Sequence, residues 1–232
     1  QGDLLQGTNY IRSALEVNPA LLEAWYNLGA IQLEQGNYEK AQNSFTKALE
    51  LAPQDSEICN NLGTALFYSC EPEEAKLHFQ EAVRLDNTNS AAKNNLGLIL
   101  KKNGNLDSAL QNFKQALVQH PDYIDPMRNM GNTQEIKGNL QEAEDTYHRI
   151  LEIDPHDAKT LNNLGAINLK RRLYSNSHYY YQKAIEADPE DTSFYSNYLM
   201  LLHYTNDLSA RELYKRHLNF EKYFETSRPD DK

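Results

Sequence analysis

A glycine recurs every 34 residues along most of the chain, and other residue types keep the same period. The glycines are Gly29, Gly63, Gly97, Gly131 and Gly165. Each is followed at a fixed distance by a small residue, namely Ala41, Ala75, Ala109, Ala143 or Ser177. Each is followed further on by an aromatic residue, namely Phe45, Phe79, Phe113, Tyr147 or Tyr181. Such a period predicts a stack of similar units, because one short unit cannot bury its own apolar face.

Five complete units follow one another without an insertion. We place them at 22–55, 56–89, 90–123, 124–157 and 158–191. In the first unit, apolar residues recur at helical spacing in two blocks, which predicts two amphipathic helices. We expect Gly29 on the first helix to face Ala41 on the second, so that the two axes approach closely. No segment alternates apolar and polar residues as a strand would, so the chain is predicted to be all-α.

The ends of the helices carry their own signals. Between the two helices, Gly36 would supply a left-handed stop and Asn37 would cap the next helix. A proline near the end of a unit, such as Pro53, cannot continue the second helix and so separates the units. Gly104 with Asn105 and Gly138 with Asn139 repeat the same turn.

The pattern over 22–191 resembles the tetratricopeptide repeat (TPR) family. This resemblance implies a right-handed superhelical solenoid of antiparallel helix pairs. It also implies a module that holds other proteins. Beyond these units, 1–21 reads as the second helix of an incomplete repeat, whose first helix would precede it in the natural chain. Residues 192–226 read as a degenerate repeat that caps the stack, and 227–232 as a tail.

The C-terminal segment carries a second resemblance. Residues 196–224 are similar to the junction in SPINDLY-type O-GlcNAc-transferase-like proteins, where TPR units lead into a glycosyltransferase region. The matching residues are Ser196, Asn197, Leu199, Leu202, His203, Tyr204, Asp207, Leu208, Ser209, Glu212, Leu213 and His217. This resemblance implies that the chain is the substrate-recognition part of a larger enzyme. Tyrosine is frequent here, and two interpretations stay open: an aromatic cap, or a docking surface for a following domain.

An asparagine occupies the sixth position of every unit. These residues are Asn27, Asn61, Asn95, Asn129, Asn163 and, in the degenerate unit, Asn197. On a helix, positions 2, 6, 9 and 13 share one face, which we call the asparagine face. An amide offers donors and an acceptor that match a peptide backbone. The TPR resemblance implies that this face lines a concave groove and contacts an extended peptide; the alternative is hydrogen bonding between repeats.

Neighbours on the asparagine face would set specificity. The candidates are Tyr68, Leu98, Lys102, Asn132, Ile136 and Lys170. A narrower TPR function, a clamp for a carboxylate tail, needs a lysine where the first unit has Tyr26. Only Arg128 is basic at that position of the units, so we do not favour this function.

No enzyme motif or metal-ligand pattern occurs, so we predict no catalytic, cofactor or metal residues. Cys59 is expected to be buried, and Cys70, which replaces the turn glycine, to be exposed. With two cysteines and no secretory signal, we expect a cytoplasmic protein. The formal charge of −10 argues against a nucleic-acid partner. The chain lacks a long apolar run, which argues against a membrane span. Self-association through the two repeat ends is a third hypothesis.

Overall fold

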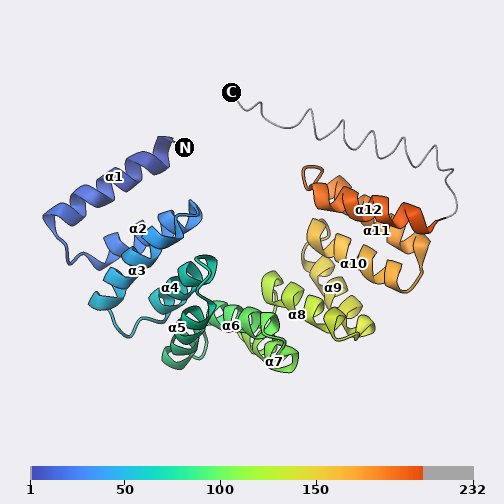
Figure 1. Ribbon diagram of the computed structural model, residues 1–232, viewed down its shortest axis with the longest axis horizontal. Coiled ribbons are helices and arrows are strands. Elements are labelled where there is room, and N and C mark those ends of the chain that lie inside the picture. Colours follow the sequence, from blue (N-terminus) through green and yellow to red (C-terminus); the bar gives the residue numbers. More distant parts are fainter. Residues whose placement is uncertain (1, 206–232) are drawn as a thin grey trace. The chain divides into compact units, whose positions relative to one another are not determined.

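The computed structural model describes residues 2–205, and this part of the chain forms α-helices without any strand (Figure 1). The prediction of an all-α repeat fold is confirmed. The helices are α1 (Gly2–Val17), α2 (Leu22–Glu34), α3 (Tyr38–Leu51), α4 (Ser56–Tyr68), α5 (Pro72–Leu85), α6 (Ser90–Lys102), α7 (Leu106–Ala116), α8 (Ile124–Ile136), α9 (Leu140–Ile153), α10 (Ala158–Lys170), α11 (Tyr174–Ala187) and α12 (Thr192–Tyr204). The first helices of the five complete units begin at the first residue of the unit that we assigned from the sequence.

The chain divides into two compact units, Gln1–Pro126 and Met127–Lys232, and α8 begins just before the boundary. In the first, α2 packs on α3, α4 on α5, and α6 on α7 as antiparallel pairs (Figure 1). Each pair also contacts the next, through α3 with α4 and α5 with α6. In the second, α10 packs on α9, α11 and α12. Each compact unit is therefore a stack of helix pairs, with clusters of buried apolar residues between them.

The glycine at the eighth position of each unit, which we call the glycine column, lies against both the small residue and the aromatic ring of the second helix. A β-carbon on Gly63 would lie 3.2 Å from the backbone oxygen of Ala75, and one on Gly29 would lie 2.8 Å from Cε1 of Phe45. The same substitution at Gly165 would place a β-carbon 2.6 Å from Cδ1 of Tyr181. The Ser177 hydroxyl also donates to the backbone oxygen of Gly165 at 2.8 Å, so the expected close approach of glycine and small residue is present and the ring packs over it. Phe45 and Ala41 are both fully buried in the core.

Two of the five inter-helix turns place a non-glycine residue in the left-handed region. Gly36, Gly104 and Gly138 have φ angles of 71°, 80° and 84°, as predicted for helix-stopping glycines. In the other two units, Cys70 and Arg172 occupy the equivalent position of the turn, with φ angles of 67° and 60°. An L-residue is strained there by contact between its β-carbon and the backbone. Cys59 is buried and Cys70 exposed, as the sequence predicts.

Side-chain capping occurs at the N-termini of first helices, whereas we expected it at the N-termini of second helices. Asn37, like Asn105 and Asn139, stands at the N-cap position, but its side chain makes no capping hydrogen bond. The backbone ψ near 60° at these residues differs from the extended conformation of a usual cap. Side-chain caps instead begin four of the first helices, α4, α6, α10 and α12. They are Asp55, Asn89, Asp157 and Asp191.

The two ends of the described chain are built differently. At the N-terminal end, Leu15 of α1 packs with Ala24 and Leu28 of α2 in a small core. At the other end, Leu199 stands where the complete units have glycine, and it is buried with Phe194 of the same helix. The expected second helix of this degenerate unit lies outside the described residues. Within residues 2–205, no helix is both long and apolar enough for a membrane span.

Candidate peptide-binding face

The sixth-position asparagines all keep some solvent exposure, each on the first helix of its unit. In the first compact unit, α2, α4 and α6 carry Asn27, Asn61 and Asn95. Asn27 is exposed and the other two are half-buried. In the second compact unit, Asn129, Asn163 and Asn197 lie on α8, α10 and α12 and are half-buried. None of the six amides is withdrawn into the core.

Hydrogen bonds join these asparagines to the preceding first helix. The Nδ2 group of Asn95 donates to Oδ1 of Asn60 at 3.0 Å, and that of Asn61 donates to the Tyr26 hydroxyl at 3.2 Å. In the second compact unit, Asn197 donates to Asn162 at 2.9 Å. The bonding between repeats that the sequence left open as an alternative is therefore present.

This bonding does not use the whole amide. An asparagine side chain has two N–H donors and an oxygen with two lone pairs. Asn197 uses one donor in its bond to Asn162. Asn95 uses more, because its Nδ2 group also donates to Oγ1 of Thr64 at 3.3 Å and its Oδ1 accepts from Asn94, so its remaining capacity lies on the oxygen. The bond between repeats also fixes the rotamer of the amide, so less side-chain entropy is lost when a ligand binds. A structural role and a binding role are compatible in the same residue.

Aromatic side chains flank the asparagines in the first compact unit. Tyr68 is 54% exposed and stacks on Tyr38 with ring centroids 5.1 Å apart. The Lys102 ammonium lies 5.6 Å from the centroid of the Phe67 ring. Asn95, Tyr68 and Leu98 border a small pocket of about 40 Å³ on this surface. Three of the predicted specificity residues, Tyr68, Leu98 and Lys102, thus belong to one polar and aromatic surface.

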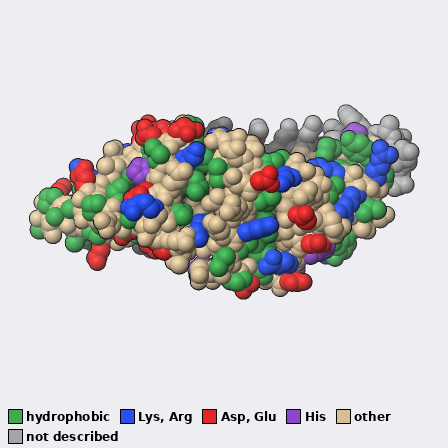
Figure 2. All heavy atoms as spheres, turned by 90° about the horizontal axis from the view of Figure 1, so that it is seen from below, with side chains coloured by type: hydrophobic (Ala, Val, Ile, Leu, Met, Phe, Trp, Pro, Cys, Tyr) green, Lys and Arg blue, Asp and Glu red, His purple; other side chains and the backbone are tan. Residues whose placement is uncertain are grey.

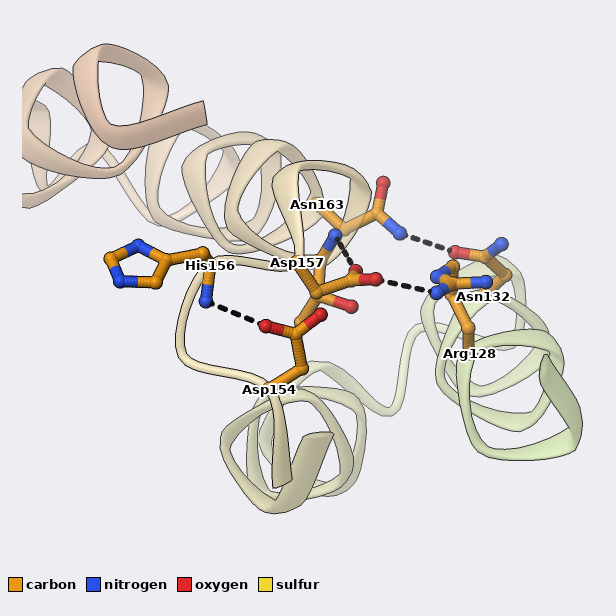
Figure 3. Close-up of polar contacts among 7 residues, drawn as sticks. Arg128, Asn132, Asp154, His156, Asp157 and Asn163 are labelled. Atoms are coloured by element: carbon orange, nitrogen blue, oxygen red, sulfur yellow. Dashed lines mark hydrogen bonds and ion pairs between the residues drawn. The ribbon is translucent and has the colours of Figure 1, made fainter. Parts of the chain in front are cut away.

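In the second compact unit, a polar network supports the face where α8 meets α10 (Figure 3). Asn163 donates to Oδ1 of Asn132 at 3.0 Å, and the Tyr147 hydroxyl donates to the same oxygen. Beside them, Arg128 contacts Asp157 at 2.7 Å, with both side chains largely buried. Arg128 is therefore committed to an internal ion pair, which adds to the sequence argument against a carboxylate clamp.

Burial and hydrogen bonding shift the pKa of Asp157 in opposite directions. Burial alone would raise the pKa of this carboxyl group, but hydrogen bonds from Thr160 and Arg128 lower the pKa below its ordinary value. The carboxylate accepts from the Thr160 backbone N–H at 2.7 Å and so caps α10. One charged group thereby starts α10 and ties it to α8.

A larger pocket of about 420 Å³ opens in the second compact unit between α10, α11 and α12. Asn197 and Lys170, which the sequence places on the asparagine face, both line it. Sequence reasoning missed the other lining residues, which include Arg172, Met200 and Tyr204. The signal that could have found Arg172 is its position, since it replaces the turn glycine with a charged residue.

Charge is mixed on the face of the described residues that Figure 2 shows. On the face drawn in Figure 2, Lys and Arg side chains are interspersed with Asp and Glu and form no continuous basic patch among the coloured residues. Within residues 2–205, no group of three or more His, Cys, Asp or Glu side chains is placed to hold a metal ion.

Two family models match the chain. The model described as the cytochrome c-type biogenesis protein H TPR domain matches residues 4–128, more than half of the 232 residues. A model described as tetratricopeptide repeat matches residues 100–166. Curated proteins gave no match to the chain. The resemblance of 196–224 to the SPINDLY-type junction stays a prediction, and 206–224 lie outside the described residues.

Solved structures with the same fold cover most of the chain. PilF of Pseudomonas aeruginosa is 19% identical, with a TM-score of 0.75 over 88% of this chain and 92% of that one. The type IV pilus biogenesis factor PilW is 24% identical, with a TM-score of 0.75 over 84% and 90%. YrrB, described as a TPR protein with an unusual peptide-binding site, is 22% identical, with a TM-score of 0.59 over 80% and 96%. The 34-residue period, the stacked helix pairs and the family match together show that this chain belongs to the tetratricopeptide repeat family.

Proposed function

We propose that the chain is a protein-interaction module that holds an extended peptide segment of a partner along its asparagine face. The observation that carries this proposal is the set of amides fixed by hydrogen bonds between repeats, such as Asn95 on Asn60 and Asn197 on Asn162. These two amides are held in one orientation, and the oxygen of each keeps at least one lone pair that can accept from a peptide N–H.

The expected affinity is modest. Each amide-to-backbone hydrogen bond contributes about 0.5–1.5 kcal/mol net. Several such bonds can offset the entropy cost of ordering a disordered peptide. They contact the peptide backbone, so they do not distinguish one peptide sequence from another. Sequence preference would come from Tyr68 and Leu98 in the first compact unit and from the pocket beside Asn197 in the second. The peptide-binding site named for YrrB supports the proposal by analogy of fold.

The test separates peptide contact from the structural role of the amides. Peptides would be selected from a display library of random twelve-residue sequences on the full chain, and the selected peptide measured by fluorescence anisotropy. In one double variant, Asn61→Ala with Asn95→Ala removes two amides of the asparagine face in the first compact unit. In the matched control, Tyr26→Phe with Asn60→Ala breaks the same two hydrogen bonds from their other side.

We expect the first variant to weaken peptide binding by about tenfold, since two bonds of roughly 0.7 kcal/mol would be lost. The control should bind within about twofold of the parent chain. Equal weakening in both variants would mean that the amides act only between repeats. Failure to select any saturable peptide would remove the proposed function.

We further propose that the chain is non-catalytic, and that it works in the cytoplasm. The lack of an enzyme motif and the two free cysteines support these proposals. The alternative role, as the substrate-recognition part of a glycosyltransferase, rests on the resemblance of 196–224 alone. A sugar-nucleotide-binding region following in the parent reading frame would support that alternative. Self-association through the repeat ends would appear as concentration-dependent sedimentation.

A further inference from the structure

The pocket between α10, α11 and α12 combines an apolar wall with polar groups that have unused capacity. Its volume of about 420 Å³ lies within the roughly 300–1,000 Å³ of typical ligand sites. Met200 and Tyr204 line it and remain 47% and 57% exposed. Exposed methionine and aromatic side chains are adaptable apolar contacts, and a bound side chain would remove them from water.

Tyr181 lines this pocket and brings a hydroxyl group to it. The residue as a whole is 1% exposed, so its ring is held in the core. A phenolic hydroxyl can donate one hydrogen bond and can accept others, so it can pair with a polar group of a ligand that enters the pocket. Burial and, secondly, the nearby charge of Glu135 raise the pKa of Tyr181 to about 12, so the hydroxyl stays protonated at neutral pH.

Arg172 supplies an unneutralised positive charge. Its neighbours are paired, since Lys170 contacts Glu135 at 2.6 Å and Arg171 contacts Glu144. Arg172 lines the pocket, is exposed, and makes no ion pair within the described part of the chain. Its backbone is in the left-handed region, where glycine would be less strained. In a chain of formal charge −10, this local surplus favours an anionic group on the ligand.

We propose that this pocket binds an aromatic side chain of an extended peptide together with an acidic residue next to it in that peptide. The ring contacts Met200 and Tyr204, the neighbouring carboxylate pairs with Arg172, and the Tyr181 hydroxyl donates to the peptide. Asn197 lines the same pocket and holds the backbone as on the rest of the asparagine face. This assignment deepens the proposed function and rests on it.

The probe is a fluorescein-labelled peptide, Gly-Ser-Asp-Phe-Asp-Ser-Gly, measured by anisotropy on the full chain. Two comparison peptides are used. The first replaces both aspartates by lysine, and the second replaces phenylalanine by serine. Tyr181→Phe removes only the hydroxyl, and three other units carry phenylalanine at this position, namely Phe45, Phe79 and Phe113. Arg172→Gly removes the charge and relieves the strained turn. Its matched control is Cys70→Gly, which makes the same backbone change in a turn outside the pocket.

We expect the aspartate-flanked peptide to bind at least about fivefold more tightly than either comparison peptide. Tyr181→Phe should weaken its binding by about two- to tenfold, as expected for one hydrogen bond. Arg172→Gly should weaken it by a similar factor at low salt, with a smaller difference at high salt because ions screen exposed charges. Cys70→Gly should leave it unchanged.

The inference is overturned if both pocket variants bind the peptide as the parent chain does, or if the lysine-flanked peptide binds as tightly. It is also overturned if the aspartate-flanked peptide shows no saturable binding. The library-selected peptide keeps the two proposals distinguishable. If that peptide still responds to Asn61→Ala with Asn95→Ala, which lie outside the pocket, the proposed function stands while the pocket assignment fails.

Discussion

A β-carbon on Gly97 would lie 2.6 Å from Cε1 of Phe113, closer than real β-carbon contacts allow. Gly97→Ala must therefore displace a fully buried ring. We expect a loss of about 1–3 kcal/mol in the free energy of unfolding, typical of overpacking a core. Urea denaturation followed by circular dichroism measures it.

The control for that substitution is Gly7→Ala. Gly7 lies within α1, and nothing is found within 4 Å of the β-carbon that alanine would add. Alanine has the higher helix propensity, by up to about 1 kcal/mol, so this variant should be neutral or slightly stabilised. A Gly97→Ala variant as stable as Gly7→Ala would contradict the packing described for the glycine column.

Replacing Cys70 by glycine should stabilise the protein. Cys70 has a φ angle of 67°, where a β-carbon costs roughly 1–2 kcal/mol. We expect a gain of about 1 kcal/mol, reduced by the greater freedom of glycine in the unfolded chain. The converse change, Gly138→Ala at φ 84° with open space around it, should cost a similar amount through the backbone alone. Thermal unfolding that moves both variants in the same direction would refute the strain argument.

The buried hydrogen bond between Ser44 and Gln32 predicts a non-additive pair of substitutions. The Ser44 hydroxyl donates to Oε1 of Gln32 at 2.7 Å, and both residues are buried. Ser44→Ala leaves the amide without this donor and should cost about 1–3 kcal/mol. Adding Gln32→Leu should recover much of that loss, since leucine occupies the same position in two other units, as Leu66 and Leu100. Additive losses in a double-mutant cycle would show that the pair does not interact.

Asp157 predicts a loss of stability at acidic pH. Its pKa lies below the ordinary 3.8 in the folded state, so the folded state favours the carboxylate. This stabilisation is complete above the unfolded pKa. It declines as the pH falls below about 3.8 and is lost once the pH passes the depressed folded value.

Asp157→Asn keeps an oxygen that can cap α10 but removes the charge that pairs with Arg128. Its free energy of unfolding should be lower than that of the parent at neutral pH. The gap should narrow as the pH falls below 3.8. Urea midpoints measured from pH 7 to pH 2 test this, and parallel pH profiles for the two proteins would be the contrary result.

The fold could be predicted from the period because the residue type at each repeating position has a physical cause. Gly29, its counterparts and the aromatic column were enough to predict the boundaries of the helix pairs. The contact between the glycine and the small residue of the second helix was predicted correctly, as Gly63 with Ala75 shows. The cover that the Phe45 ring gives to Gly29 was not predicted, because sequence spacing does not say how far a side chain extends from its helix.

The site was predicted less completely. The sixth-position asparagines could be placed on one face, but their bonds to the preceding unit depend on distances between helices, which no single unit encodes. The pocket beside Asn197 was missed because residues from three helices form it. Met200 and Tyr204 look like ordinary core residues of the last unit until their exposure is known.

The backbone at Arg172 has a consequence for laboratory selection. A screen that rewards only resistance to heat should replace this arginine with glycine, because the turn favours the smaller residue. A screen that rewards capture of acidic peptides should retain it. The two screens would therefore select different residues at position 172. At position 70, in the equivalent turn of another unit, the first screen would select glycine and the second would have no preference.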